Sequence, residues 1–339
     1  MSDSIVSLGI IGCGVGARNV HLPALARVPR LRVAALCDSS EAALASALLG
    51  ASARRLADWR QLLGAPDLDA LAVLTPPDTH AELGCAVLAS GKHLFLDKPL
   101  AASAADGERL VAAARSSRGK AFLGHNYRWH RLVEQGRSFV RSGALGALRA
   151  IRSVYTHHHR GPGVQPWHRL RSRGGGVLLN DGVHHFDMWR FLLDREIEEL
   201  KLHSADTEEF QDQTCTVSAR LSGGVLGSAI FSFGSGAESV VEIFGDEGRL
   251  ELSLYQFDGL RFVPAVAPPG GFGVRARAAA ASLRSLPVAV RGLRGQGDVA
   301  TAAVDMWRSF ADCVLRDLPP PCTLLDGRQA MRALFDALS

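Results

Sequence analysis

The chain contains 339 residues, of which 47% are hydrophobic and 21% are charged, and its formal net charge is +4 at pH 7. This length corresponds to about two domains, and the apolar fraction suffices for a large core, which excludes a disordered or fibrous chain. The 38 Lys and Arg residues nearly balance the 34 Asp and Glu residues. The composition therefore argues against a dedicated nucleic-acid-binding protein.

The distribution of apolar residues and cysteines predicts the compartment. No apolar run approaches the roughly 18 residues that cross a bilayer, so no membrane association is expected. The apolar segment 5–11 lacks a preceding basic stretch and ends in glycines, which favours a strand over a signal peptide. The six cysteines show no C-x-x-C spacing, which argues against a zinc site or a disulfide framework. We therefore predict a cytoplasmic protein.

Short apolar runs alternate with helical patterns in the first part of the chain. The alternation predicts a parallel sheet covered by helices, with a Rossmann-like domain over residues 1–124. Pro23 is expected to break or bend the first helix. The predicted strands are 8–11, 31–37, 68–74, 93–96 and 121–123, and the predicted helices are 17–28, 41–49, 79–90 and 104–116.

The pattern changes after residue 145. Consecutive strands joined by short glycine-containing turns favour an antiparallel sheet, so residues 125–339 are expected to form an α+β domain. The predicted strands are 147–157, 214–221, 225–233, 239–244 and 249–254, and the predicted helices are 176–193, 304–315 and 328–338.

A glycine-rich turn predicts a dinucleotide site. The sequence G-C-G-V-G-A at residues 12–17 fits G-x-G-x-x-A and lies between a predicted strand and a predicted helix. Gly12 permits the tight turn, Gly14 lets the backbone approach a pyrophosphate, and Ala17 allows close packing. Asp38 ends the next strand, where its carboxylate can accept from ribose hydroxyls. Ser39 follows without an adjacent arginine for a 2′-phosphate, so NAD is favoured over NADP.

Two further segments follow predicted strands, where ligands bind in sheets of this kind. In T-P-P-D-T-H, Thr75 and Pro76 begin a stiff wall, and His80 lies in the first turn of the next helix. On local grounds His80 is either an exposed histidine or a cofactor neighbour. In D-K-P, Lys98 lies near the expected nicotinamide position, although a surface lysine is the alternative. A cis bond before Pro99 would fix the direction of this lysine.

The segment 174–187, G-G-G-V-L-L-N-D-G-V-H-H-F-D, is the second informative stretch. Its glycines permit a close approach to a ligand and then a helix start. Asn180 and His184 are four residues apart and share one helix face. A buried structural histidine is the alternative for His184. The run of histidines at 157–159 does not predict a metal centre, because adjacent strand residues alternate faces.

Together these motifs resemble the glucose–fructose oxidoreductase/inositol dehydrogenase (Gfo/Idh/MocA) family, in order and spacing along nearly the whole chain. The resemblance implies an α/β fold in which a Rossmann domain precedes an α+β domain. In that second domain a large, mainly antiparallel, open sheet binds substrate and mediates oligomers, here a homodimer or homotetramer. It also implies hydride transfer between NAD(P) and a secondary alcohol or ketone of a sugar, polyol or nucleotide-sugar.

The family's functional residues carry over by position. Lys98 matches the lysine of the family's E-K-P motif, with Asp97 in place of Glu. His184 matches the active-site histidine, and Asn180 replaces an aspartate that often partners it. The neighbouring Asp181 is not expected to substitute, because one helical step turns it about 100° away. The segment N-Y-R-W at 126–129 resembles a family segment near the nicotinamide.

The resemblance therefore implies three groups of site residues. Lys98, His184 and Asn180 are the predicted catalytic residues. The predicted cofactor contacts are Gly12, Gly14, Val15, Ala17, Asp38, Ser39, Thr75, Pro76, His80, Lys98, Asn126 and Arg128. The predicted substrate contacts are Lys98, Tyr127, His157, Trp167, Arg171, Asn180 and His184.

The leading hypothesis is an NAD-dependent dehydrogenase that acts on a sugar-like alcohol. The alternatives are a sugar lyase or hydrolase that oxidises its substrate transiently, and a non-enzymatic regulator that senses NAD or sugar. The arginine-rich stretch 264–297 is either a solvated segment or a clamp for a phosphate-bearing or acidic substrate.

Overall fold

The computed structural model describes residues 5–47, 53–161, 163–256, 259–265 and 298–339, with four isolated positions between 272 and 280. The proposed clamp in the stretch 264–297 falls almost entirely outside the described residues. Within the described residues, no helix combines the length and the apolar character needed to cross a membrane.

The first sheet is parallel throughout, with the strand order β3-β2-β1-β4-β5-β6. This confirms the predicted Rossmann-like sheet. Every residue of β1 and β4 is buried, as expected for strands covered on both faces. The strands are β1 (Val6–Ile11), β2 (Leu31–Cys37), β3 (Arg54–Leu56), β4 (Ala70–Val73), β5 (His93–Asp97) and β6 (Ala121–Gly124).

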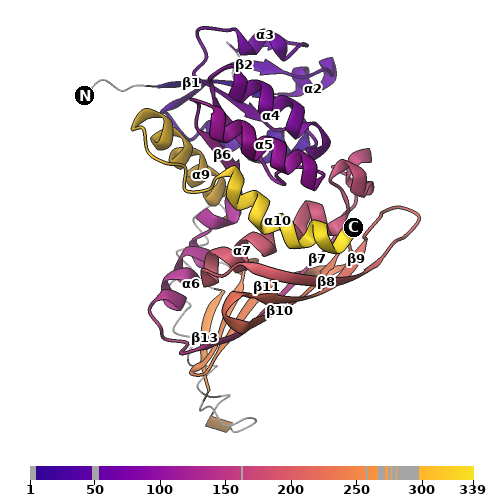
Figure 1. The fold of residues 1–339 in the computed structure, drawn as a ribbon, viewed down its shortest axis with the longest axis vertical. Coiled ribbons are helices and arrows are strands. Elements are labelled where there is room, and N and C mark those ends of the chain that lie inside the picture. The colour runs from indigo at the N-terminus through magenta and orange to yellow at the C-terminus, as the bar shows by residue number, and fades with distance from the viewer. Residues whose placement is uncertain are drawn as a thin grey trace.

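Helices cover the two faces of the first sheet, as Figure 1 shows. One face packs against α4 (His80–Ala89) and α5 (Ala104–Ser116). The other face packs against α1 (Leu22–Leu25) and, from the far end of the chain, α9 (Asp298–Leu315). The short helices α2 (Glu41–Ser46), η2 (Pro77–Thr79) and α3 (Arg60–Leu63) complete this part.

The second sheet has seven strands in the order β13-β12-β11-β7-β10-β9-β8, and only β10 and β7 run parallel. The prediction of a mainly antiparallel sheet is therefore confirmed. Burial alternates residue by residue in β9, so one face of the sheet is buried and the other exposed. The strands are β7 (Leu148–His158), β8 (Ile197–Ala205), β9 (Thr214–Leu221), β10 (Val225–Ser232), β11 (Gly234–Gly245), β12 (Gly248–Ser253) and β13 (Leu260–Pro264).

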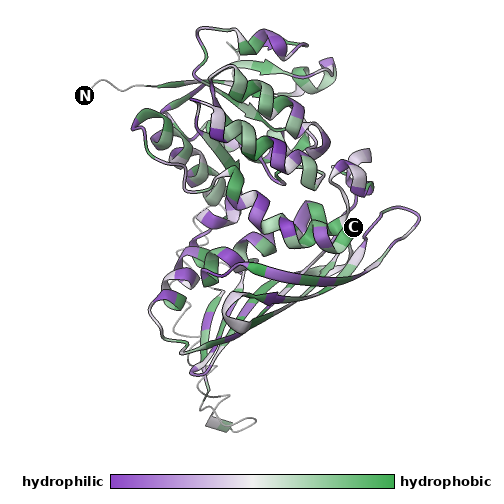
Figure 2. Cartoon of the chain, in the orientation of Figure 1, coloured by the Kyte–Doolittle hydropathy of each residue, from purple (hydrophilic) through white to green (hydrophobic). Residues whose placement is uncertain are grey.

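Two helices pack between the sheets. α7 (Val183–Leu193) lies on the buried face of the second sheet, where Trp189 donates a hydrogen bond to Ser153 of β7. α10 (Leu324–Leu338) contacts α5 of the first part and α7 and β8 of the second, and Figure 1 shows it crossing between them. Figure 2 shows hydrophobic and hydrophilic residues mixed along both helices, and the hydrophobic residues Phe186, Leu192 and Leu334 lie in the buried core.

Several predicted elements differ in the structure. The predicted helix 17–28 is a π-helix, η1 (Ala17–His21), followed by the single turn of α1, and Pro23 lies in the first turn of α1. The predicted helix 176–193 likewise begins with a π-helix, η6 (Leu178–Gly182). The sequence analysis predicted neither α6 (Arg131–Arg141) nor the strands β3, β8 and β13. The remaining short helices are η3 (Asn126–Trp129), η4 (Pro166–Arg169), η5 (Arg171–Arg173) and η7 (Ser222–Gly224).

Candidate active site

A cavity of about 1130 Å³ opens at the carboxyl ends of the first sheet and extends to the start of α7. Both parts of the chain form its wall, because the segment 159–168 after β7 faces the ends of β2, β4 and β5. The predicted site residues that line it are Gly12, Gly14, Val15, Asp38, Ser39, Thr75, Pro76, Lys98, Asn126, Trp167, Asn180 and His184.

The glycine turn forms one end of the cavity. Gly12 has a φ of +98°, and a side chain there would lie 2.8 Å from the carbonyl carbon of Leu74. A Cβ on Gly14 would meet no protein atom within 4 Å, although Gly14 lines the cavity. Asp38 accepts hydrogen bonds from the amides of Cys13 and Ser40, both at 2.8 Å. The turn and the carboxylate are therefore held together beside open space that a cofactor can fill.

The D-K-P segment lies at the middle of the cavity. The Lys98–Pro99 peptide bond is cis. The Asp97 carboxylate accepts from the Lys98 amide at 2.9 Å and lies 3.3 Å from Nε2 of His21. Burial opposes ionisation of Asp97, but the charges of His21 and Lys98 outweigh it and hold the pKa of this carboxyl below its usual range. Asp97 therefore carries a negative charge behind the lysine.

Lys98 and the start of α7 meet across the cavity. The Lys98 ammonium donates a 2.6 Å hydrogen bond to the backbone carbonyl of Asn180 in η6. The His184 ring packs on Tyr127, with ring centroids 4.6 Å apart. Burial, followed by the charges of Lys98 and His125, lowers the pKa of His184 well below its usual value. Within the described part of the chain, Nδ1 of His184 has no hydrogen-bond partner.

Several predicted cofactor contacts lie behind the cavity wall. Ala17, the first residue of η1, is buried. Both ring nitrogens of His80 lie 2.9 Å from backbone carbonyls, those of Thr75 and Pro99, so this side chain joins the ends of β4 and β5.

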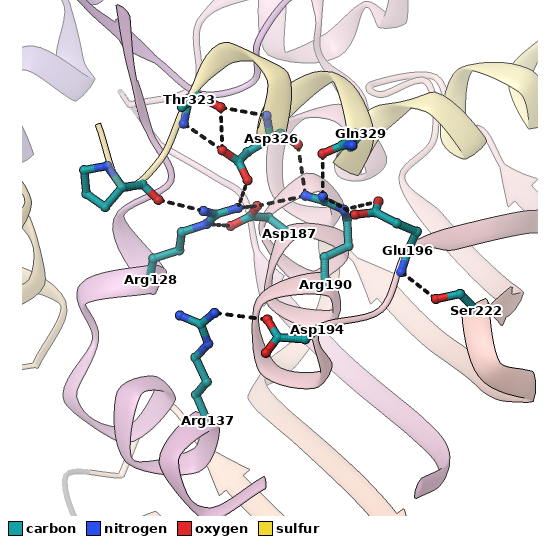
Figure 3. Close-up of polar contacts among 11 residues, drawn as sticks. Arg128, Arg137, Asp187, Arg190, Asp194, Glu196, Ser222, Thr323, Asp326 and Gln329 are labelled. Atoms are coloured by element: carbon teal, nitrogen blue, oxygen red, sulfur yellow. Dashed lines mark hydrogen bonds and ion pairs between the residues drawn. The ribbon is translucent and has the colours of Figure 1, made fainter. Parts of the chain in front are cut away.

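Arg128, another predicted cofactor contact, does not line the cavity and instead takes part in a buried ionic network (Figure 3). It forms a bidentate pair with Asp187 of α7, at 2.8 and 2.6 Å, and also contacts Asp326 of α10. In the same network Arg190 of α7 binds Glu196 and the backbone carbonyl of Asp326. These contacts join η3, α7 and α10.

Two predicted substrate contacts are likewise engaged with other protein groups. Arg171 forms a bidentate pair with Asp212, at 2.5 and 2.6 Å. His157 lies 3.1 Å from the carboxylate of Asp181.

The glycines of 174–176 pack against protein. A side chain on Gly174 would contact Pro77 at 2.5 Å, and one on Gly175 would contact the Trp167 carbonyl at 2.2 Å. Gly174 therefore permits a close approach between the two parts of the chain, and Gly175 permits one within the second part.

Sequence analysis missed several cavity residues. His159, Arg160, Gln165 and His168 line the wall opposite the first sheet, and Met306 reaches the cavity from α9. The run of histidines at 157–159 was a usable signal, because His157 and His159 lie on one strand face with ring centroids 5.5 Å apart. No described group of His, Cys, Asp and Glu side chains has the geometry of a metal site.

Comparison with known proteins identifies the family. Residues 6–125 match the family "Oxidoreductase family, NAD-binding Rossmann fold", and residues 133–251 match the "GFO/IDH/MocA C-terminal domain".

Three curated relatives act on sugar-like or polyol compounds, as their names state. The chain is 30% identical over 253 residues to the dTDP-3,4-didehydro-2,6-dideoxy-alpha-D-glucose 3-reductase of Saccharopolyspora spinosa, covering 72% of this chain and 74% of that one. It is 30% identical over 250 residues to the 1,5-anhydro-D-fructose reductase of Ensifer adhaerens, covering 71% and 74%. It is 28% identical over 208 residues to the myo-inositol 2-dehydrogenase of Thermotoga maritima, covering 57% of this chain and 59% of that one.

Solved structures share the fold. The WlbA dehydrogenase of Bordetella pertussis, in complex with NADH and UDP-GlcNAcA, matches with a TM-score of 0.81 at 19% identity, over 99% of this chain and 96% of that one. A levoglucosan dehydrogenase in complex with NADH and L-sorbose matches with a TM-score of 0.79 at 18% identity, over 98% and 95%. With both of its domains matched, the chain belongs to the Gfo/Idh/MocA family of NAD(P)-dependent oxidoreductases.

Proposed function

We propose that this protein is an NAD-dependent dehydrogenase or reductase that transfers hydride between the nicotinamide and a secondary alcohol or ketone of a sugar or polyol. One observation carries the proposal. The cavity that begins at the glycine turn and Asp38 also contains Lys98 and His184. The names of the relatives, which include sugar reductases and an inositol dehydrogenase, support this substrate class.

The residues present fit a dinucleotide. Gly14 and Gly16 leave open space beside backbone amides at the start of η1, where a pyrophosphate would bind. Asp38 retains lone pairs for ribose hydroxyls, and its negative charge disfavours the 2′-phosphate of NADP. Asn126 lines the cavity with its side-chain oxygen buried and without a partner among the described residues. When bound beside Thr75 and Pro76, the nicotinamide would supply the hydride acceptor or donor.

Lys98 and His184 act on the reacting oxygen. In the oxidation direction, Lys98 holds the substrate oxygen and stabilises its developing negative charge. His184 accepts the hydroxyl proton while the hydride leaves the same carbon. The lowered pKa of His184 keeps the ring neutral at pH 7, so it is ready to accept a proton. Asn180 orients His184 or a substrate hydroxyl.

The test is a screen of the purified protein with NAD⁺ and a panel of sugars and polyols, read at the absorbance of NADH. Each active sugar is then compared with its nucleotide-linked form. We expect NADH to accumulate with at least one member of the panel. Conversion of a glycoside with catalytic NAD⁺ and no accumulation of NADH would instead indicate transient oxidation. NADH binding without turnover of any compound, together with capture of a stable partner protein, would indicate a regulator.

A further inference from the structure

Oxidation of an alcohol releases a proton, and the surroundings of His184 disfavour the protonated form of its ring. Burial disfavours the charged ring, and the positive charge of Lys98 disfavours it further. The position four residues before His184 is occupied by Asn180, which cannot neutralise an imidazolium. A proton on His184 therefore has no adjacent anion to stabilise it, and it must move on before the next turnover.

The carboxylate of this region is Asp181. It is only 9% exposed, and its Oδ2 lies 3.1 Å from Nε2 of His157. Burial opposes ionisation of Asp181, but the hydrogen bond from His157 and the charge of Lys98 outweigh it and lower the pKa of this carboxyl. Asp181 is therefore a buried anion at neutral pH, paired with an imidazole.

A continuous set of contacts connects His184 to this pair. The Tyr127 ring packs on His184, and the side chain of Tyr127 interacts with that of Tyr155. The Tyr155 ring lies 5.4 Å from the ring of His157 and 6.3 Å from the ring of Tyr255, which is 49% exposed.

Tyrosine is rare in this chain and is concentrated in the cluster beside His184. The chain contains 14 phenylalanines but only three tyrosines, and all three lie in this one cluster. An aromatic ring alone could be supplied by phenylalanine, so the hydroxyl groups are the distinguishing feature of the cluster.

We propose that His157 and Asp181 form the proton-holding pair of the active site, an inference that rests on the dehydrogenase function proposed above. Because Nε2 of His157 donates to Asp181, Nδ1 is the ring nitrogen that can bind a proton. The resulting imidazolium of His157 faces the Asp181 carboxylate, whereas His184 has no carboxylate beside it among the residues that the structure describes.

The proton and the hydride are both accounted for. In oxidation, the C–H bond of the substrate breaks and its hydride goes to the bound nicotinamide. The O–H bond breaks, and its proton passes to His184. Exchange through the hydroxyls of Tyr127 and Tyr155 then forms an N–H bond on His157, while each hydroxyl gives up one proton and gains another. Solvent finally removes the proton from His157, and reduction runs the same steps in reverse.

Charged and titratable groups surround the pair from every element packed on it. The groups that interact with Asp181 are Lys98 after β5, Tyr127 in η3, Tyr155, His157 and His159 on and after β7, His168 in η4, His185 in α7 and Tyr255 after β12. Glu209 interacts with His159 and Glu238 with Tyr255, so Asp181 is the carboxylate that contacts His157 itself.

The experiment compares H157Q, D181N and the double variant with the wild type, with H158Q as the matched control. His158 is the next residue of the strand, is exposed and points to the other face. We expect each single variant to lower kcat at pH 7 by about tenfold or more, with NADH affinity unchanged. We expect the double variant to be no slower than either single variant, because the two residues act as one unit. Activity of the variants should recover as the pH is raised, because hydroxide then removes the proton.

Three kinetic results would overturn the inference. These are losses that multiply in the double variant, a pH profile unchanged in both single variants, or an equal loss in H158Q. A second experiment needs no turnover, so it tests the His157–Asp181 pair independently of the proposed dehydrogenase function. Nitrogen-15 NMR of the His157 ring should show protonation at Nε2 in the wild type and a changed tautomer in D181N. Identical spectra would overturn the pair, even for a protein that oxidises no sugar.

Discussion

His184 lies where the two parts of the chain meet, and we propose that it contacts the reacting oxygen of the substrate. It lies at the start of α7, packs on Tyr127 of η3, and shares the cavity with Lys98 from the end of β5. Its neutral ring and the lysine charge suit the two tasks of alcohol oxidation, which are accepting a proton and stabilising an oxyanion.

Replacing His184 by alanine removes the proton acceptor but leaves the glycine turn intact. We expect H184A to lower kcat by about 10²–10⁴-fold, the usual contribution of a general base, while NADH binding is retained. The matched control is H203A, which changes an exposed histidine of β8. Steady-state kinetics with calorimetry would check this, and near-full turnover by H184A would remove the residue from the mechanism.

Single-residue prediction worked best where a motif fixes the backbone. The glycine turn, Asp38 and Lys98 line one cavity because the strand ends of a parallel sheet share one edge, and the start of α7 brings His184 to the same cavity. Arg128 and Arg171 show why other assignments could not be made from sequence. Their carboxylate partners, Asp187 and Asp212, are 59 and 41 residues away in the chain, so no local pattern reveals the ion pairs.

Two π-helices shape the elements around the cavity. η1 follows the glycine turn, and η6 carries Asn180 and Asp181 into α7. The wider π turn changes which residues share a face, and side-chain spacing in the sequence does not distinguish it from an α-helix. By contrast, α6 carries apolar residues at Leu132, Val133 and Phe139 that pack on the core, so this helix could have been predicted from the sequence.

The turn between β1 and η1 is expected not to tolerate a side chain at Gly12. In G12A, the methyl group meets Leu74 and Thr75 at 2.8 Å, and the residue must adopt a φ of +98°. We expect a loss of about 1–3 kcal/mol in folding free energy and at least tenfold weaker NADH binding.

The control for G12A is G16A. Gly16 has a φ of −60°, and its Cβ would meet no protein atom within 4 Å. Urea unfolding should show wild-type stability for G16A, and equal stability of the two variants would contradict this account of the turn.

In the molecule as a whole, the network of Figure 3 holds η3, α7 and α10 together. Arg128 and Asp187 are both buried, so loss of one partner leaves an uncompensated charge. We expect D187N to lower the free energy of unfolding by about 3–5 kcal/mol at pH 7. Urea unfolding would measure this loss.

The Arg128–Asp187 pair is expected to make the free energy of unfolding depend on pH. Burial opposes ionisation of Asp187, but the charges of His125 and Arg128 outweigh it, so its pKa in the folded state lies below the usual 3.8. Its contribution is therefore complete above that value and is lost as the pH falls through the lower folded pKa. The stability difference between wild type and D187N should be constant from about pH 7 to pH 5 and shrink below about pH 4. A difference that shrinks between pH 7 and pH 5 would contradict this assignment.

The exposed face of the second sheet is the surface where we expect copies of the chain to associate. On β10, Leu226 is 56% exposed and Ile230 is 47% exposed, on the side opposite to Trp189. We expect light scattering to show a homodimer or homotetramer, and the double variant L226E/I230E to shift it toward the monomer. A monomeric wild type would contradict this expectation.

We propose that the cavity binds NAD and that Asp38 selects NAD over NADP. Calorimetric titration of cofactor-free protein with NADH and with NADPH tests this most directly, with D38N as the comparison variant. We expect tight NADH binding, weak NADPH binding and a smaller difference between the two affinities in D38N. Preference for NADPH would contradict the role of Asp38, and binding of neither cofactor would contradict the oxidoreductase function itself.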